Sequence, residues 1–137
     1  MKYVSTFTLI LFFLFGNYAN AQRFDKVEIE TIKVSDHVYM LLGAGGNIGI
    51  SIGDDGIFII DDQFAPLTKK IHTAIKALSE KDIKFLVNTH HHGDHTGGNE
   101  NMQKLGATII AHDNVRQRLE TTPKRDGSSE AKAALPI

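Results

Sequence analysis

The spacing of apolar residues changes abruptly in the middle of the chain, and this change limits the possible fold more than any other feature. Ile48, Ile50 and Ile52 alternate with small or polar residues, which is the period of a strand with one buried face. From residue 67 to residue 78, apolar residues recur at spacings of four, three, one and three, which is typical of one stripe on a helix. Strands followed by an amphipathic helix predict an α/β fold in which sheet and helix share one core.

The remaining pattern extends this prediction in both directions. Residues 27–34 and 38–42 are expected to form strands, and the turn signal Gly53–Gly56 joins the central strand to another at residues 57–60. Because residues 57–60 form an uninterrupted apolar run, we expect the strand that they form to be buried on both sides. The first part is therefore an antiparallel meander. Strand, helix, strand and helix are then expected over residues 83–87, 98–105, 108–111 and 114–120.

Composition excludes several classes of partner and site. The chain of 137 residues contains no Cys, which removes disulfides and thiolate metal ligands together. Its formal net charge is -1, and no cluster of Lys and Arg stands out, so a nucleic-acid partner is not expected. Any metal must be held by His, Asp or Glu. The oligomeric state leaves no signature in the sequence.

The first 21 residues have the features of a secretory signal. Lys2 is followed by an almost unbroken apolar run over residues 7–15, and Ala19-Asn20-Ala21 offers the small residues that a signal peptidase needs. We expect cleavage after Ala21 and a periplasmic or secreted protein. The apolar run is shorter than the ~20 residues that span a bilayer, so a stable membrane anchor is not expected. Residues 22–137 would form the mature domain.

Residues 88–99 contain the most informative motif, His-x-His-x-Asp-His at positions 90–95. In an extended segment, residues two apart face the same way, so His90, His92 and Asp94 are expected to converge while His91 turns outward. Gly93 would permit the bend that brings His95 alongside. Because loops after buried strands carry the sites of α/β proteins, the motif predicts a metal site there.

Imidazole and carboxylate ligands suit zinc, although iron and manganese accept similar sets. A bound cation with an open position lowers the pKa of water to near 7, and the resulting hydroxide can attack a polarised carbonyl. Asp94 is the predicted catalytic residue, because a carboxylate there can orient the hydroxide and accept its proton. The alternative is a solvated histidine-rich loop that scavenges metal without specificity.

Residues 89–99 resemble the signature of the metallo-β-lactamase fold superfamily, and the resemblance extends over residues 34–120. It implies an αββα sandwich, of which this chain carries only the N-terminal half. It also implies one or two zinc ions, with His90 and His92 on the first, and Asp94 and His95 on the second. Asp61 would support the metal loop by hydrogen bonding, although an ordinary strand-end carboxylate remains the alternative. The implied activity is hydrolysis of a small molecule containing an amide, ester, lactone or thioester, and a β-lactam is one candidate.

The same resemblance requires a third histidine on the first metal, a bridging acid and a last histidine, all from the second half of the fold. The other histidines are expected elsewhere: His37 in a turn, His72 exposed on a helix and His112 at a helix start. We therefore expect residues 22–137 to be a domain incomplete at its C-terminus, and the chain to be a fragment. A non-catalytic periplasmic zinc-binding protein and an inactive fragment remain alternative functions.

Overall fold

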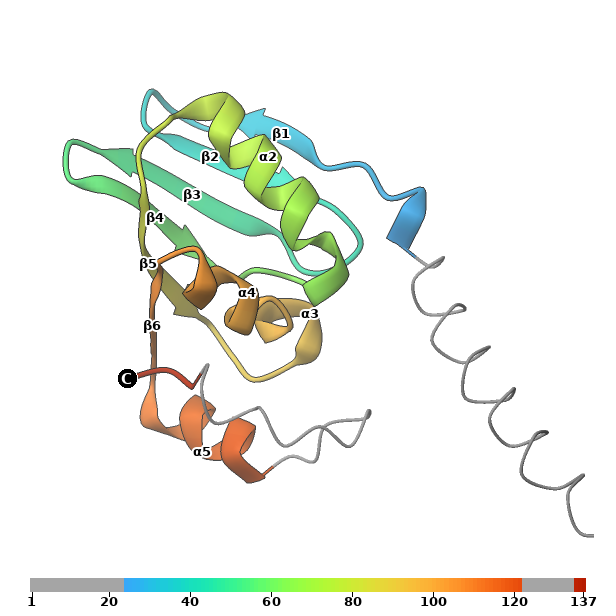
Figure 1. Ribbon diagram of the computed structural model, residues 1–137, viewed down its shortest axis with the longest axis vertical. Helices are drawn as coiled ribbons and strands as arrows, with labels where there is room; N and C mark the ends of the chain where they lie inside the picture. The colour runs from blue at the N-terminus through green and yellow to red at the C-terminus, as the bar shows by residue number, and fades with distance from the viewer. Residues whose placement is uncertain (1–23, 122–134) are drawn as a thin grey trace, which may run out of the picture.

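The computed structural model describes residues 24–121 and 135–137, so the predicted signal sequence and most of the predicted C-terminal loop lie outside the described residues. Six strands form one sheet in chain order, antiparallel from β1 to β4 and parallel from β4 to β6 (Figure 1). The meander and the α/β order are thus confirmed. The strands are β1 (Glu30–Lys33), β2 (Val38–Leu42), β3 (Ile48–Gly53), β4 (Gly56–Ile60), β5 (Ile83–Asn88) and β6 (Thr108–Ala111).

Helices cover one face of this sheet. The helical segments are η1 (Ala65–Leu67), α2 (Thr68–Leu78), α3 (Gly93–Thr96), α4 (Asn99–Lys104) and α5 (Asp113–Thr121). Leu67, Ile71 and Ile75 form the buried stripe of η1 and α2, and they pack against the sheet in one apolar core. None of these helices has the length and apolar character that crossing a bilayer would require.

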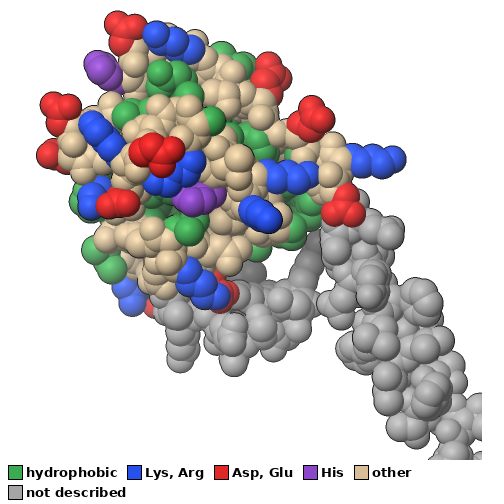
Figure 2. Space-filling model, turned by 45° about the horizontal axis from the view of Figure 1, so that its top comes forward, with side chains coloured by type: hydrophobic (Ala, Val, Ile, Leu, Met, Phe, Trp, Pro, Cys, Tyr) green, Lys and Arg blue, Asp and Glu red, His purple; other side chains and the backbone are tan. Residues whose placement is uncertain are grey.

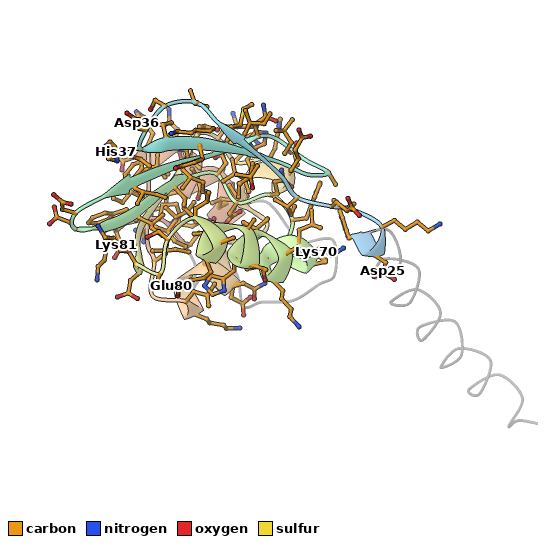
Figure 3. All side chains as sticks on the ribbon, turned by 90° about the horizontal axis from the view of Figure 1, so that it is seen from above. Asp25, Asp36, His37, Lys70, Glu80 and Lys81 are labelled. Carbon is orange, nitrogen blue, oxygen red and sulfur yellow. The ribbon has the colours of Figure 1, made fainter. Side chains whose placement is uncertain are left out.

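The chain before β1 is attached at the start of α2. The Lys70 ammonium donates hydrogen bonds to the carbonyl oxygens of Phe24, Asp25 and Val27, at 3.1, 2.8 and 2.7 Å (Figure 3). The Phe24 ring is buried and lies 5.0 Å from the Phe64 ring, centroid to centroid. Together, a cation on three carbonyls and an aromatic contact fix the entry of the chain into the sheet.

The opposite face of the sheet carries apolar side chains that no described segment covers. The registers place Val38, Ser51, Phe58 and Phe85 in one row across four strands. Phe58 and Phe85 are 36% and 44% exposed, and Ile60 is 40% exposed. The expectation that residues 57–60 are buried on both sides is therefore wrong for the described chain. An apolar run predicts two apolar faces, but the described helices whose side chains join the core, η1, α2 and α4, cover one of them.

The parallel strands determine which segments meet. Because β4 and β5 run parallel, the residues that follow them emerge at the same edge of the sheet. The β2–β3 loop reaches this edge as well, since the start of β3 pairs with the end of β4. We call this edge the site end. The opposite end carries the β3–β4 turn and the Glu80–Lys81 turn before β5 (Figure 3).

Candidate metal site

Asp61, the first residue after β4, connects the segments of the site end through hydrogen bonds. Its carboxylate accepts hydrogen bonds from the Thr89 amide at 2.8 Å, the Thr89 hydroxyl at 2.7 Å and Nδ1 of His95 at 2.7 Å. The residue is 3% exposed, and its backbone is left-handed with φ 61°. A non-glycine residue in that conformation is strained, and it persists where surrounding contacts hold it. Here the three hydrogen bonds tie the end of β4 to the histidine loop.

These contacts also fix which nitrogen of two histidines is free. Asp61 occupies Nδ1 of His95, which leaves the Nε2 lone pair available. The Thr89 hydroxyl has a single hydrogen and gives it to Asp61, so it accepts one from Nδ1 of His90 at 3.0 Å. His90 therefore also presents Nε2. One buried carboxylate thus orients both imidazoles, His95 directly and His90 through Thr89.

The four predicted ligands gather in one cluster. The His90 ring lies 3.9 Å from the His95 ring and 4.7 Å from the His92 ring, between centroids. Asp94 places Oδ2 3.5 Å from Nε2 of His95, and its side chain is 40% exposed. Asp94 and Asp61 thus lie at opposite edges of the His95 ring. The cluster offers nitrogen and carboxylate donors on its exposed side, a donor set that fits zinc.

Another trio of potential donors occurs at the same place. Ligand atoms of Asp61, His90 and His95 all lie within 4.8 Å of one another. The Asp61 oxygens, however, already accept three hydrogen bonds. A ligand oxygen needs a free lone pair directed at the metal, and Asp94 is the more exposed carboxylate of the two. Asp61 is therefore placed to orient the histidines, whereas Asp94 carries the carboxylate that is more accessible to an ion.

Two further details of the loop bear on the sequence prediction. The His91 ring lies 4.7 Å from that of His92, and His91 is half-buried while His92 is exposed. Burial, together with the charges of His92, Arg118 and His90, lowers the pKa of His91. Gly93 has no positive φ, and a Cβ added there would meet no atom within 4 Å. It simply begins α3, so the turn there does not require glycine.

Buried polar residues bind the backbone of His95 through hydrogen bonds. Its carbonyl oxygen accepts hydrogen bonds from the Asp62 amide at 3.0 Å and from the Asn88 side chain at 3.4 Å. Asn99 donates to the Asn88 side-chain oxygen at 2.8 Å. Asp62 is fully buried and accepts a hydrogen bond from the Gly98 amide at 3.0 Å. The histidine loop therefore rests on a polar layer that fixes the C-terminal end of α3.

Burial raises the pKa of Asp62 to about 8, since an ionised carboxylate loses its hydration there. The Gly98 amide partly offsets this effect, and the negative charge of Asp61 adds to it. Asp62 is consequently protonated at neutral pH. The two adjacent aspartates differ in role: Asp61 is directed at the histidines and Asp62 at the backbone of Gly98.

Thr89, Gln63, Asn88 and Asn99 were not singled out from the sequence as functional. Their positions in the sequence nevertheless offer a signal. Gln63, Asn88 and Thr89 are polar residues at or just beyond the end of a strand, and Asn99 is a polar residue at the start of a helix. Gln63, Asn88 and Asn99 are buried, and buried polar groups are as a rule hydrogen-bonded. Recognising them required knowing that β4 and β5 are neighbours.

The other histidines lie elsewhere. Nδ1 of His112 accepts a hydrogen bond from the Asn114 amide at 3.1 Å, which is a helix-start contact at α5. His37 is exposed in the turn between β1 and β2. His72 on α2 is half-buried, not exposed as predicted, because it follows the core residue Ile71.

Comparison with known families agrees with this geometry. The family model described as the metallo-beta-lactamase superfamily matches residues 46–135. The chain belongs to the metallo-β-lactamase superfamily. Its six-stranded sheet with helices on one face corresponds to part of that fold.

Individual proteins and solved structures also resemble this chain. A hydroxyacylglutathione hydrolase of Pelagibacter ubique (strain HTCC1062) is 44% identical over 48 residues, which are 33% of this chain and 20% of that protein. The subclass B3 metallo-β-lactamase BJP-1 of Bradyrhizobium japonicum superposes with a TM-score of 0.64 at 25% identity, covering 85% of this chain and 45% of the enzyme. The subclass B3 enzyme MEM-A1, from a soil metagenome library, gives 0.62 at 25% identity over 75% of this chain and 41% of that one. The chain spans less than half the length of each of these relatives.

Proposed function

We propose that this chain carries part of the active site of a zinc-dependent hydrolase, with His90, His92, Asp94 and His95 as metal ligands and Asp94 as the catalytic residue. The observation that supports this most directly is the pair of contacts from Asp61. A buried carboxylate that binds Nδ1 of one histidine and reaches Nδ1 of the other through Thr89 leaves the Nε2 atom of each imidazole free. A solvated histidine-rich loop would not need such buried support.

The residues have separate tasks in this proposal. A divalent metal supplies Lewis-acid chemistry, by polarising a carbonyl and lowering the pKa of water to near 7. Asp61 and Thr89 keep the two imidazoles in the tautomer that exposes Nε2. The Asp94 carboxylate, which is 40% exposed, accepts a proton from the attacking water and passes it to the leaving group.

The substrate is proposed to be a small molecule with an activated acyl bond, namely an amide, ester, lactone or thioester. The names of the relatives support this range, since one is a hydroxyacylglutathione hydrolase and others are β-lactamases. On the face seen in Figure 2, Lys and Arg side chains lie among Asp and Glu side chains, so no charge of one sign dominates it.

The proposal is tested by pairing Asp94→Asn with the matched control Asp54→Asn, which changes an exposed aspartate at the opposite end of the sheet. Zinc affinity is measured by competition with a chromogenic chelator, and hydrolysis is measured on a β-lactam, a lactone and an S-acylglutathione, in a protein that carries these residues within the complete fold. We expect Asp94→Asn to lower the hydrolysis rate at least about 100-fold, because general-base catalysis contributes that much. Asp54→Asn should behave as the wild type.

Two outcomes would overturn the proposal. One is stoichiometric zinc binding that Asp94→Asn leaves intact while the wild type hydrolyses none of the three substrates, which would favour a zinc-sequestering protein. The other is the absence of stoichiometric zinc binding, which would mean that the clustered histidines do not form a metal site.

A further inference from the structure

The β2–β3 loop, residues 43–47, lies directly against the histidine loop; we call it the glycine loop. A Cβ added to Gly46 would lie 2.5 Å from Nε2 and 2.8 Å from Nδ1 of His95. A Cβ added to Gly45 would lie 2.9 Å from the Asp94 carbonyl oxygen. All three distances are too short for real Cβ contacts, so backbone without a side chain fits at these positions. The backbone of Gly46 therefore packs against the imidazole of His95.

One side chain keeps the glycine loop in this place. Nε2 of Gln63 donates a hydrogen bond to the Gly46 carbonyl oxygen at 2.6 Å. Gln63 is fully buried, and a Cβ added to Gly43 would lie 2.5 Å from its Oε1. The amide group is thus enclosed by the same loop that it binds. A longer hydrogen bond also joins the glycine loop to the histidine loop directly, from the Gly46 amide to the Asp94 carbonyl oxygen at 3.3 Å.

The backbone of Gln63 joins this support to the rest of the site. It has a left-handed conformation with φ 57°, and its carbonyl oxygen accepts a hydrogen bond from the Gly98 amide at 3.1 Å. A buried, strained residue persists only where several contacts hold it, and such residues concentrate at functional sites. Gln63 contacts the glycine loop with its side chain and the start of α4 with its backbone.

We propose that Gln63 is a positioning residue for the metal site, because it holds the glycine loop on His95 and so fixes the direction of the His95 Nε2 atom. This inference rests on the proposed function, since it concerns the same ligand. The physical reason is that the hydrogen bond from Nδ1 to Asp61 is one contact at one atom, about which the ring can still tilt. Backbone packed against the ring removes that freedom.

The test compares Gln63→Met and Gly46→Ala with the matched control Gly53→Ala. Methionine keeps the length of the side chain and removes the donor. At Gly53, an added Cβ would meet only the Gly56 carbonyl oxygen, at 3.9 Å. We expect Gln63→Met and Gly46→Ala each to weaken zinc binding about tenfold, as loss of an orienting contact does. The absorption bands of the cobalt-substituted protein should shift in both variants, while Gly53→Ala matches the wild type.

A double variant identifies the route of the effect. If Gln63 acts only by holding Gly46 on the ring, Gln63→Met adds nothing to Gly46→Ala, because both remove the same contact. Independent, additive losses would contradict the inference. Unchanged zinc affinity and unchanged cobalt spectra in Gln63→Met would contradict it too. Far-UV circular dichroism checks folding, and if Gln63→Met does not fold, Gly46→Ala on its own decides the outcome.

A metal-free measurement separates this inference from the proposed function. Imidazole nitrogen–proton correlation spectra of the wild type should show His95 as a single, narrow Nδ1–H tautomer, and Gln63→Met should broaden or shift those signals. If the wild type fails to bind zinc, the proposed function fails, and the imidazole spectra still show whether Gln63 positions His95. Identical His95 signals in wild type and Gln63→Met would overturn the positioning role.

Discussion

The two ends of the sheet use the same residue types in different ways. At the opposite end, Asp54 and Asp82 are exposed and lie 3.8 and 3.5 Å from the ammonium groups of Lys81 and Lys84. At the site end, Asp61 and Asp62 are buried and accept hydrogen bonds from backbone and side-chain donors. Exposed ion pairs contribute little to stability, whereas a buried polar group that loses its partner is costly. The two ends therefore differ in how deeply their aspartates are buried and in what binds them, not in residue type.

Glycines show the same contrast. Gly46 and Gly53 stand at the two ends of the β3 region, and an added Cβ would collide with His95 at the first but would meet only one atom at the second. The site end is crowded because three segments meet there, namely the residues after β4, the residues after β5 and the β2–β3 loop. Parallel pairing of β4 and β5 produces that convergence.

The largest expected effect comes from replacing an aspartate at each end. Asp61→Ala leaves three donors without an acceptor and places alanine at a positive φ, so we expect a loss of about 3 kcal/mol in the free energy of unfolding. Asp54→Ala removes only an exposed ion pair and should cost about 0.5 kcal/mol or less. Urea unfolding of metal-free protein, followed by circular dichroism, measures both. Equal losses would abolish the contrast between the ends.

Asp61→Asn divides the larger effect into its two causes. Asparagine tolerates the left-handed backbone as aspartate does, but its amide nitrogen cannot accept a hydrogen bond. We expect this variant to be intermediate between wild type and Asp61→Ala. If it were as stable as the wild type, backbone strain alone would explain the alanine result.

A smaller effect is expected in the pH dependence of stability. The pKa of Asp62 is raised from 3.8 to about 8 in the folded state, so the folded protein holds this proton more tightly than the unfolded chain. The stabilising contribution is therefore complete below about pH 4, decreases as the pH rises and is lost above about pH 8. Asp62→Asn is neutral at every pH and should remove this part of the slope between about pH 4 and about pH 8.

The matched control for Asp62 is Asp82→Asn, which removes the same formal charge from an exposed residue at the opposite end. Unfolding in urea is measured across the pH range on metal-free protein. The slopes are compared, not the absolute stabilities, because the asparagine amide in Asp62→Asn is itself a buried donor. A slope identical to that of the wild type would show that Asp62 does not titrate in this range.

Much of this arrangement could be predicted from the sequence. The period-two pattern of residues 48–52 and the helical stripe from Leu67 fixed the order of strands and helix, and the His-x-His-x-Asp-His spacing located the cluster. Which face of β4 is covered could not be read locally, because an apolar run does not report what packs on it. The contact between Gln63 and Gly46 could not be predicted either, because these residues are 17 apart in the chain and meet only through strand pairing.

The smallest expected effect tests whether mere position at the site end makes a glycine necessary. Gly93 lies within the histidine motif, yet it has no positive φ and an added Cβ would meet nothing within 4 Å. Gly93→Ala should leave zinc affinity unchanged and alter stability by less than about 1 kcal/mol, with a gain expected because alanine favours the helix that begins there. Gly97→Ala is the matched contrast: its Cβ would lie 2.5 Å from the Gly93 carbonyl oxygen and 2.8 Å from that of Gln63, so we expect a loss of about 2 kcal/mol from overpacking. If Gly93→Ala were as damaging as Gly97→Ala, the local space around each glycine would not be the property that sets its importance.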